Sequence, residues 1–178
     1  MILKKWSDIP DNIKNSKTHE YYKKLNTKKN KLLIKRFLDI LFSLILLILL
    51  LPIFMVLAIC IKIDSNGSIF YRQERITTYG KKFRIFKFRT MVQNADKIGS
   101  LITVNNDSRI TRVGKIIRKL RLDELPQLIN ILIGDMSFVG TRPEVEKYVD
   151  KYTDEMKATL LMPAGVTSEA SIKYKDED

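Results

Sequence analysis

The sequence predicts a mostly helical α+β protein, in which a bent, re-entrant membrane helix carries a small domain on one side of a bilayer. Three observations support this prediction: an apolar run over residues 40–61, basic residues on both sides of it, and two short alternating segments after it. A helix that crosses once cannot place both basic flanks on the cytoplasmic side. We therefore expect the helix to leave the membrane on the face where it entered.

Composition restricts the chemistry that this chain can perform. At 178 residues it suits one globular domain plus an attachment, and its formal net charge of +12 predicts an anionic partner. Nucleic acid, anionic lipid and a phosphorylated substrate all fit that charge. One histidine and one cysteine leave no place for a Ser-His-Asp mechanism, an internal disulfide or a zinc site built from cysteines. Carboxylates and arginines are the groups that remain.

Residues 1–35 are predicted to be a basic N-terminal extension. Lysine dominates this segment, with acidic side chains only at Asp8, Asp11 and Glu20. Basic residues just before an apolar run are typical of segments that lie on an anionic membrane surface, and we expect residues 23–36 to lie there. A solvated, partly helical arm is the alternative.

Residues 36–63 are predicted to form the membrane segment. The apolar run within it is interrupted only by Ser43 and Pro52. At about 1.5 Å per residue the run can reach across a hydrocarbon core of about 30 Å. Pro52 removes a backbone hydrogen bond near the middle of the run, which permits the bend that a re-entrant path needs. A proline-kinked helix that crosses the bilayer and a buried helix of a soluble domain are the alternatives.

An acidic residue stands at the entrance of this membrane segment. Asp39 follows Lys35 by four residues and Arg36 by three, so it can pair with either basic side chain. It could instead extend its carboxylate toward the lipid headgroups. Both arrangements keep its charge away from the hydrocarbon.

A β-hairpin is predicted after a turn signal that follows the membrane segment. Residues 68–74 and 83–88 have the composition of strands and flank a loop that contains Gly80. Lys87 and Arg89 share one face of the second strand, because side chains alternate along a strand. Two cations on one face could hold phosphate, or could be the solvated side of a sheet.

Helices are predicted after the hairpin. Residues 113–120 place apolar side chains at helical spacing opposite a basic face, which is typical of a helix that packs on a core or lies in a lipid interface. Residues 125–132 form the next predicted helix, which Gly134 ends. Shorter helices are predicted over residues 91–98, 144–152 and 155–161. Residues 163–178 show no clear pattern.

Two adjacent carboxylates, Asp123 and Glu124, precede the helix predicted over residues 125–132. Pro126 indicates a helix start, because proline is tolerated in a first turn and is costly further in. Asp123 is then a predicted N-cap. Alternatively, the pair holds a metal ion that meets a phosphate at a helix N-terminus ringed by basic residues. The residues alone leave both interpretations open.

Several motifs of the chain occur in a fixed order. A basic-flanked apolar segment with a mid-run proline is followed by GSIFYRQER, FKFRTM and DSRITRVGKIIRKLRLDELPQLINILIGDMSFVGTRPE. This order, over about residues 35–145, closely resembles the bacterial sugar transferases that are monotopic polyprenyl-phosphate phosphoglycosyl transferases. The resemblance implies a re-entrant helix broken at Pro52 and a catalytic domain over residues 64–178 on the cytoplasmic face of the bacterial inner membrane.

The same resemblance implies an activity and its partners. Members of this family transfer a sugar 1-phosphate from a UDP-sugar to undecaprenyl phosphate and release UMP, with Mg²⁺ as the cofactor. This step initiates the assembly of a bacterial surface polysaccharide or glycoconjugate. The implied partners are therefore a UDP-sugar, undecaprenyl phosphate and membrane lipid, and nucleic acid is not among them.

Roles follow for matching positions. The resemblance implies that Asp123 is the nucleophile, which takes the phosphosugar as a covalent aspartyl intermediate. Glu124 is implied to hold the metal ion with Asp123, or to assist the polyprenyl phosphate in the second step. The basic residues implied to bind the diphosphate or nucleotide are Arg118, Arg142, Lys87 and Arg89.

The chain also departs from the family pattern. Leu51 stands where the family often has a serine before the mid-run proline, and Thr141 replaces the proline that is usual before the Arg-Pro pair. The family usually continues well beyond Asp178, which predicts a catalytic domain that is truncated at its C-terminus. An inactive membrane-anchored fragment and a basic module that binds membrane or nucleic acid are the alternative functions. The sugar, the glycan pathway and the oligomeric state stay open, with a homodimer as one option.

Overall fold

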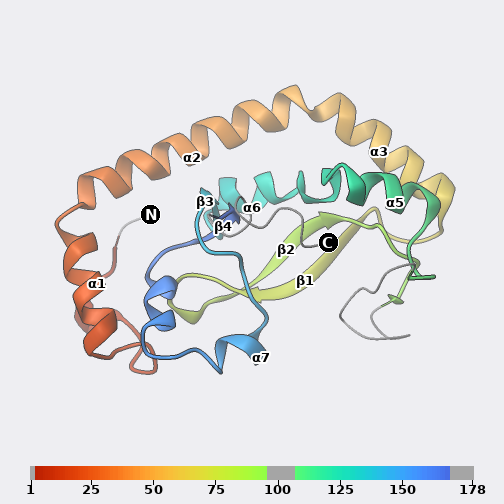
Figure 1. Cartoon of the computed structure of the whole chain (residues 1–178). Coiled ribbons are helices and arrows are strands. Elements are labelled where there is room, and N and C mark those ends of the chain that lie inside the picture. The colour runs from red at the N-terminus through yellow and green to blue at the C-terminus, as the bar shows by residue number, and fades with distance from the viewer. Residues whose placement is uncertain (1–2, 96–106, 169–178) are drawn as a thin grey trace.

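The computed structural model describes residues 3–95 and 107–168, and two long helices extend over the rest of the molecule (Figure 1). Helix α2, Lys29–Leu49, and helix α3, Leu51–Asp64, are bent by 61° at the break between them. Pro52 is the second residue of α3, where its missing N–H interrupts the backbone hydrogen bonds. A bend next to Pro52, as the sequence predicts, is therefore present.

The surface of these two helices is strongly apolar. Phe37, Ile48, Leu49 and Ile63 are each more than 60% exposed, and most of the exposed large apolar side chains among the described residues belong to α2 and α3. Such a continuous apolar surface marks an interaction site for lipid or protein. Within the described ranges no single helix has the length and apolar composition to cross a bilayer, although α2 and α3 together do.

The N-terminal residues pack onto the domain. They form a short 3₁₀ turn, Trp6–Asp8, and helix α1, Ser16–Asn26. Leu3, Ile9 and Tyr22 are buried in one apolar cluster together with side chains from the hairpin and from the C-terminal part of the chain. Residues 3–26 thus share a core with the domain.

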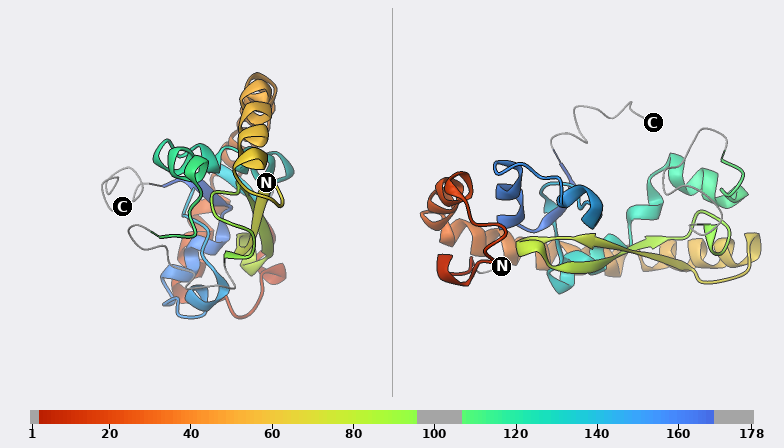
Figure 2. Two further views of the ribbon diagram at one scale, coloured as in Figure 1. Left: turned by 90° about the vertical axis from the view of Figure 1, so that its right-hand side faces the viewer. Right: turned by 90° about the horizontal axis from the view of Figure 1, so that it is seen from below.

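The predicted hairpin is confirmed. Strands β1, Phe70–Ile76, and β2, Lys82–Phe88, pair antiparallel, with Tyr71 opposite Lys87. Figure 2 shows that the hairpin runs lengthwise, in the same direction as the two long helices. This arrangement places one end of the hairpin near the junction of α3 with the domain.

Three elements in succession carry the two adjacent acids. Helix α5, Arg112–Lys119, confirms the helix predicted over residues 113–120. It is followed by a 3₁₀ turn, Leu122–Glu124, and by helix α6, Gln127–Ile133, which ends at Gly134 with a φ of +99°, as predicted. Glycine adopts this left-handed conformation without the steric cost that a Cβ would impose.

The prediction that Asp123 is an N-cap is wrong. Helix α6 begins two residues after Leu125, the N-cap position belongs to Pro126, and no side chain accepts a capping hydrogen bond there. The cause lies at Arg121, whose φ of 53° ends α5 and starts a separate 3₁₀ turn. That turn holds Asp123 away from the first turn of α6 and leaves its carboxylate available for other contacts.

The remainder of the chain forms short elements. They are α7, Glu146–Val149, a 3₁₀ helix, Met156–Leu161, and the parallel strands β3, Met136–Val139, and β4, Ala164–Thr167. The helices are shorter than those predicted over residues 144–152 and 155–161. The pairing of β3 with β4 was not predicted, and most of the helix predicted over residues 91–98 lies outside the described residues.

Two apolar clusters fasten the long helices to the domain. Phe83 and Ile85 of β2 pack with Ile131 of α6, and side chains near the end of α2, including Leu46, lie against them. Further along, Ile61 of α3 packs with side chains of β2 and α5. Because burying one such side chain is worth about 1.5–3 kcal/mol, these clusters fix the helices to the hairpin and to the elements that carry the acids.

Candidate functional site

Two carboxylates and two cations from distant parts of the chain meet beside β2. The Nζ atom of Lys87 lies 2.9 Å from Glu124 Oε1 and 3.9 Å from Asp123 Oδ2. The Nη2 atom of Arg142 lies 3.1 Å from the same Glu124 oxygen. Of the four predicted residues brought together here, Glu124 contacts both cations, and Asp123 makes only the longer contact with Lys87.

The elements that place these groups come from three parts of the sequence. Lys87 is the second-last residue of β2, Asp123 and Glu124 lie in the turn between α5 and α6, and Arg142 follows β3. Gly140 lies just before Arg142, and a Cβ at this position would meet Pro163 O at 2.6 Å. This close approach to the start of β4 directs the chain that carries Arg142.

Asn130 fixes α6 against β2 and was missed by the sequence analysis. Its side chain is fully buried; its Oδ1 accepts from Phe86 N at 2.8 Å and its Nδ2 donates to Arg84 O at 3.1 Å. The amide thus pairs with β2 as a neighbouring strand would. The amide thereby fixes the position of α6 along β2 at Phe86, the residue next to Lys87. The available signal was a polar residue on the apolar face of a predicted helix.

Burial raises the pKa of both carboxylates, but their charged neighbours outweigh this effect only at Glu124. Burial raises the pKa of Asp123 and the neighbouring charge of Glu124 adds to this, with only partial compensation from Lys87. Burial would also raise the pKa of Glu124, but the charges of Lys87 and Arg142 and the hydrogen bonds they donate outweigh it and lower that pKa. Glu124 is therefore the better compensated anion, and Asp123 is held in the less favourable environment for its charge.

A cavity of about 400 Å³ opens next to Asp123. Lys87, Arg89 and Arg118 line it together with Asp123, and Arg118 also lowers the pKa of Asp123. Three of the four basic residues predicted to bind a phosphorylated ligand therefore share one cavity with the predicted nucleophile. Arg142 is not part of the cavity lining and joins the site through its contact with Glu124.

Arg89 has a second role that the sequence did not indicate. Only 6% of this residue is exposed, and its guanidinium donates to Ser65 O at 2.6 Å and to Asn66 O at 2.9 Å. These carbonyls belong to the turn that leaves α3. Burial lowers the pKa of Arg89. The side chain thus lines the cavity while it fastens the end of α3 to β2.

The two acids are compatible with Mg²⁺. Among the described residues no group of three or more His, Cys, Asp or Glu side chains could enclose a metal ion. Mg²⁺ in phosphate-handling sites is held by one or two carboxylates and completes its shell with water and substrate phosphates. Asp123 and Glu124 supply that number of carboxylates beside a cationic cavity, so they fit an ion that is shared with a phosphorylated ligand.

Comparisons with known proteins identify relatives of most of the chain. A family model described as bacterial sugar transferase matches residues 30–178. The chain is 46% identical over 123 residues to UDP-N-acetylgalactosamine-undecaprenyl-phosphate N-acetylgalactosaminephosphotransferase of Aeromonas hydrophila, a match that covers 69% of this chain and 29% of that protein.

Two further relatives have similar names. The putative undecaprenyl-phosphate N-acetylgalactosaminyl 1-phosphate transferase of Bacillus subtilis is 44% identical over 125 residues, which is 70% of each chain. The UDP-glucose:undecaprenyl-phosphate glucose-1-phosphate transferase of Klebsiella pneumoniae is 39% identical over 143 residues, which is 78% of this chain and 30% of that protein. The chain therefore spans less than a third of the longer relatives and more than two thirds of the Bacillus subtilis protein.

Proposed function

Because this chain belongs to the bacterial sugar transferase family, we propose that it transfers a sugar 1-phosphate from a UDP-sugar to undecaprenyl phosphate and releases UMP. The observation that carries the proposal is the position of Asp123, beside a cavity lined by Lys87, Arg89 and Arg118. Cations at such a site can neutralise a diphosphate, and the carboxylate can attack it.

In the first step, an Asp123 carboxylate oxygen attacks the phosphorus that bears the sugar. The bond between this phosphorus and the bridging oxygen breaks, and UMP leaves with the electron pair. The product is a covalent aspartyl phosphosugar. Lys87 and Arg118 act on this step, because they lie where the charge of the diphosphate must be neutralised.

In the second step, a phosphate oxygen of undecaprenyl phosphate attacks the same phosphorus. The bond to Asp123 breaks, the carboxylate is regenerated, and the sugar is left on the lipid through a diphosphate. Glu124 and Arg142, which pair with each other beside Asp123 and are not part of the cavity lining, are assigned to this acceptor step. Mg²⁺, when held by Asp123 and Glu124, supplies positive charge that offsets the repulsion between carboxylate and phosphates.

The membrane assignment is supported by the exposed apolar surface of α2 and α3. A polyprenyl phosphate keeps its chain in lipid and its head at the interface, so the site must lie at headgroup depth. A re-entrant path of the bent pair, with both ends on the cytoplasmic face of the inner membrane, satisfies this requirement. An apolar groove of about 590 Å³ between α2 and β3, lined by Leu38, Phe42 and Val139 among others, suits one acceptor chain.

The proposal is tested by incubating the protein with a panel of UDP-sugars and Mg²⁺. Intact mass should show a phosphosugar adduct for one sugar, peptide mapping should place it on Asp123, and undecaprenyl phosphate should remove it. Asp123→Asn should form no adduct and release no UMP. Asp135→Asn, which changes a carboxylate paired with Lys81 instead, is the matched control and should react normally.

The same experiment separates the alternatives. Normal turnover of Asp123→Asn would refute the assigned nucleophile. Membrane binding without UMP release for any sugar would favour an inactive fragment. A basic binding module would bind anionic lipid or nucleic acid in a strongly salt-dependent manner and would be indifferent to Asp123→Asn.

A further inference from the structure

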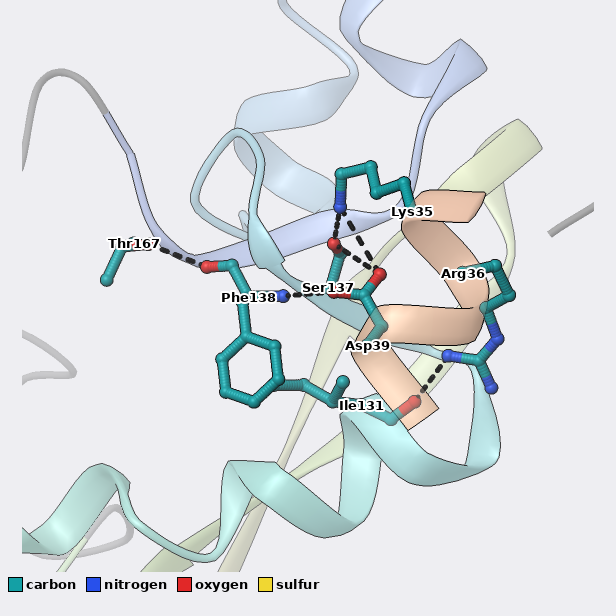
Figure 3. Close-up of polar contacts among 7 residues, drawn as sticks. All are labelled: Lys35, Arg36, Asp39, Ile131, Ser137, Phe138 and Thr167. Carbon is teal, nitrogen blue, oxygen red and sulfur yellow. Dashed lines mark hydrogen bonds and ion pairs between the residues drawn. The ribbon is translucent and has the colours of Figure 1, made fainter. Parts of the chain in front are cut away.

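One turn of α2 holds a buried polar cluster against β3 (Figure 3). Asp39 is only 6% exposed; its Oδ2 accepts from Ser137 Oγ at 2.8 Å and from Lys35 Nζ at 3.3 Å, and its Oδ1 accepts from Phe138 N at 3.2 Å. Lys35 also donates to Ser137 Oγ. Of the arrangements that the sequence left open for Asp39, pairing with Lys35 is the one present, and two residues of β3 complete it.

The same turn of α2 also holds the end of α6. Arg36 donates from Nη1 to Ile131 O at 2.6 Å and from Nη2 to Leu132 O at 2.9 Å. These carbonyls lie in the last turn of α6, where the backbone supplies only the N–H of Gly134 to Ile131 O, and a cation is favourable there. Arg36 therefore caps α6 from outside, as Figure 3 shows for Ile131.

Both contacts lead to the site. Helix α6 begins at Gln127, three residues after Glu124. At about 1.5 Å per residue the helix is only about 10 Å long, so Arg36 holds one end of a short element whose other end adjoins the acids. Strand β3 continues within a few residues to Arg142, which contacts Glu124. The segment Lys35–Asp39 thus contacts the last turn of α6, which follows the two carboxylates, and the middle of β3, which precedes Arg142.

Apolar contacts attach α2 to β2 and α6, but hydrogen bonds define its position more sharply. Apolar contacts are non-directional, so they specify the position of α2 along its axis less strictly than hydrogen bonds do. Hydrogen bonds from two successive residues of β3 to the two oxygens of Asp39 permit only one axial position. Burying a carboxylate is unfavourable unless its charge is paired and its lone pairs are satisfied, and both conditions are met here.

We propose that Asp39 is a positioning residue, which sets the depth of Asp123 and Arg142 relative to the bilayer and thereby controls transfer to the lipid acceptor. This inference rests on the proposed function. It assigns to Asp39 an effect on the step that uses a membrane-embedded substrate, and no effect on the step that uses the water-soluble donor.

The activity test compares Asp39→Ala with Ser43→Ala in vesicles of phosphatidylethanolamine and phosphatidylglycerol. Ser43 is the matched control, because it is fully buried on the same helix but donates only within it, to Ile40 O at 3.0 Å. We expect Asp39→Ala to lower transfer to undecaprenyl phosphate about tenfold or more, because small misplacements of reacting groups cost up to about 100-fold. UMP release in a single turnover without acceptor should change by less than about twofold, and Ser43→Ala should change neither.

Two additional variants keep the test decisive. Asp39→Asn retains one of the two oxygen acceptors and should keep more of the transfer than Asp39→Ala does. Ser137→Ala, a milder change, should lose part of the transfer. With a short-chain acceptor in detergent, where depth in a bilayer has no meaning, the loss in Asp39→Ala should largely disappear. Equal losses in the donor and acceptor steps would show a merely structural role and overturn the proposal.

Depth can also be measured without activity. A fluorophore on Thr141→Cys, in a Cys60→Ser background, reports the level of the exposed loop that carries Arg142 through quenching by lipids labelled at known depths. The label should change depth in Asp39→Ala and keep it in Ser43→Ala. An unchanged depth would refute the positioning role even if the unmodified chain released no UMP, whereas that lack of release would refute the proposed function separately.

Discussion

Lys87 lies 2.9 Å from Glu124 and 3.9 Å from Asp123, so a single ammonium group on β2 serves both carboxylates. Its side chain is only 23% exposed, so water screens these contacts less than it would on an open surface. Lys87 lowers the pKa of each acid and so favours the ionised form of both, together with Arg118 at Asp123 and Arg142 at Glu124. The chemistry proposed for Asp123 requires that ionised form.

Replacing Lys87 by alanine should move the acidic limb of the activity profile to higher pH. Without the ammonium, the pKa of Asp123 and that of Glu124 both rise, so a higher pH is needed to ionise the nucleophile. The measurement is kcat/KM for UMP release as a function of pH. Lys82→Ala is the control on the same strand, because Lys82 pairs with Glu74 and Glu146 instead, and its acidic limb should stay in place. An unmoved limb in Lys87→Ala would contradict the assignment.

Asp123→Asn should abolish turnover and yet stabilise the fold at neutral pH in the absence of Mg²⁺. Burial raises the pKa of Asp123 in the folded state. Its stabilising contribution is then present below the unfolded pKa, about 3.9, and is lost as the pH rises through the folded value. Neutral asparagine avoids that loss. We expect the free energy of unfolding to rise by about 0.5–1 kcal/mol, as is common for single stabilising substitutions. Thermal unfolding in detergent with a chelator should show a higher Tm at pH 7, and no gain near pH 4.

Arg142→Ala should impair activity far more than stability. The Arg142 side chain is 49% exposed, and exposed ion pairs are typically worth less than about 1 kcal/mol. In the proposed reaction, however, its guanidinium faces a phosphate, and loss of one such donor costs about 100-fold or more. Arg142→Lys should restore only part of the rate, because lysine lacks the planar fork. Lys24→Ala, which removes an exposed cation paired with Glu20 on α1, is the control and should keep full activity.

The features that the sequence predicted correctly are those encoded locally. The hairpin follows from alternating side chains around a turn, α5 from apolar residues at helical spacing, and the end of α6 from Gly134. The two acids and Lys87 were identified from residue type, pattern and family resemblance, and the fold brings them together. The structural signals each lie within about 20 residues of chain, whereas the family resemblance extends over about residues 35–145.

The features that were missed depend on partners far away in the chain. Strands β3 and β4 have four residues each, too few for a period to be visible, and they pair because Gly140 and Gly165 allow a close approach. Asp123 was assigned to a cap because nothing local reveals the left-handed Arg121 before it. The structural contacts of Arg89 with the turn after α3 are likewise invisible without the fold.

Asn130→Leu should destabilise the protein by about 1–3 kcal/mol, because it leaves the N–H of Phe86 without its acceptor, whereas the carbonyl of Arg84 keeps the hydrogen bond from Arg72. Urea unfolding in detergent measures this loss. Ile133→Ala, at an exposed position of the same helix, should cost less than about 0.5 kcal/mol. If Asn130→Leu were as stable as the unmodified chain, the amide could not be what holds α6 to β2.

Pro52→Ala should reduce the bend between α2 and α3. Alanine restores an N–H that can bond to the carbonyl of Ile48, so the two helices can continue as one. The apolar run over residues 40–61 would then be about 33 Å long, close to the thickness of a hydrocarbon core. The basic flank after the run opposes a crossing, so we expect a fraction of molecules to cross and the others to stay re-entrant.

Side-specific labelling measures that fraction. Cysteines placed singly at Lys28 and Lys81, in a Cys60→Ser background, should react with a membrane-impermeant reagent from the same side of a vesicle when Pro52 is present. In Pro52→Ala the two positions should be labelled from opposite sides in part of the population, with transfer to the lipid acceptor reduced in proportion. Leu51→Ala keeps the proline and should label as the unmodified chain does. Same-side labelling in Pro52→Ala would show that the packing of α2 and α3 on the domain, and not the proline, maintains the 61° bend.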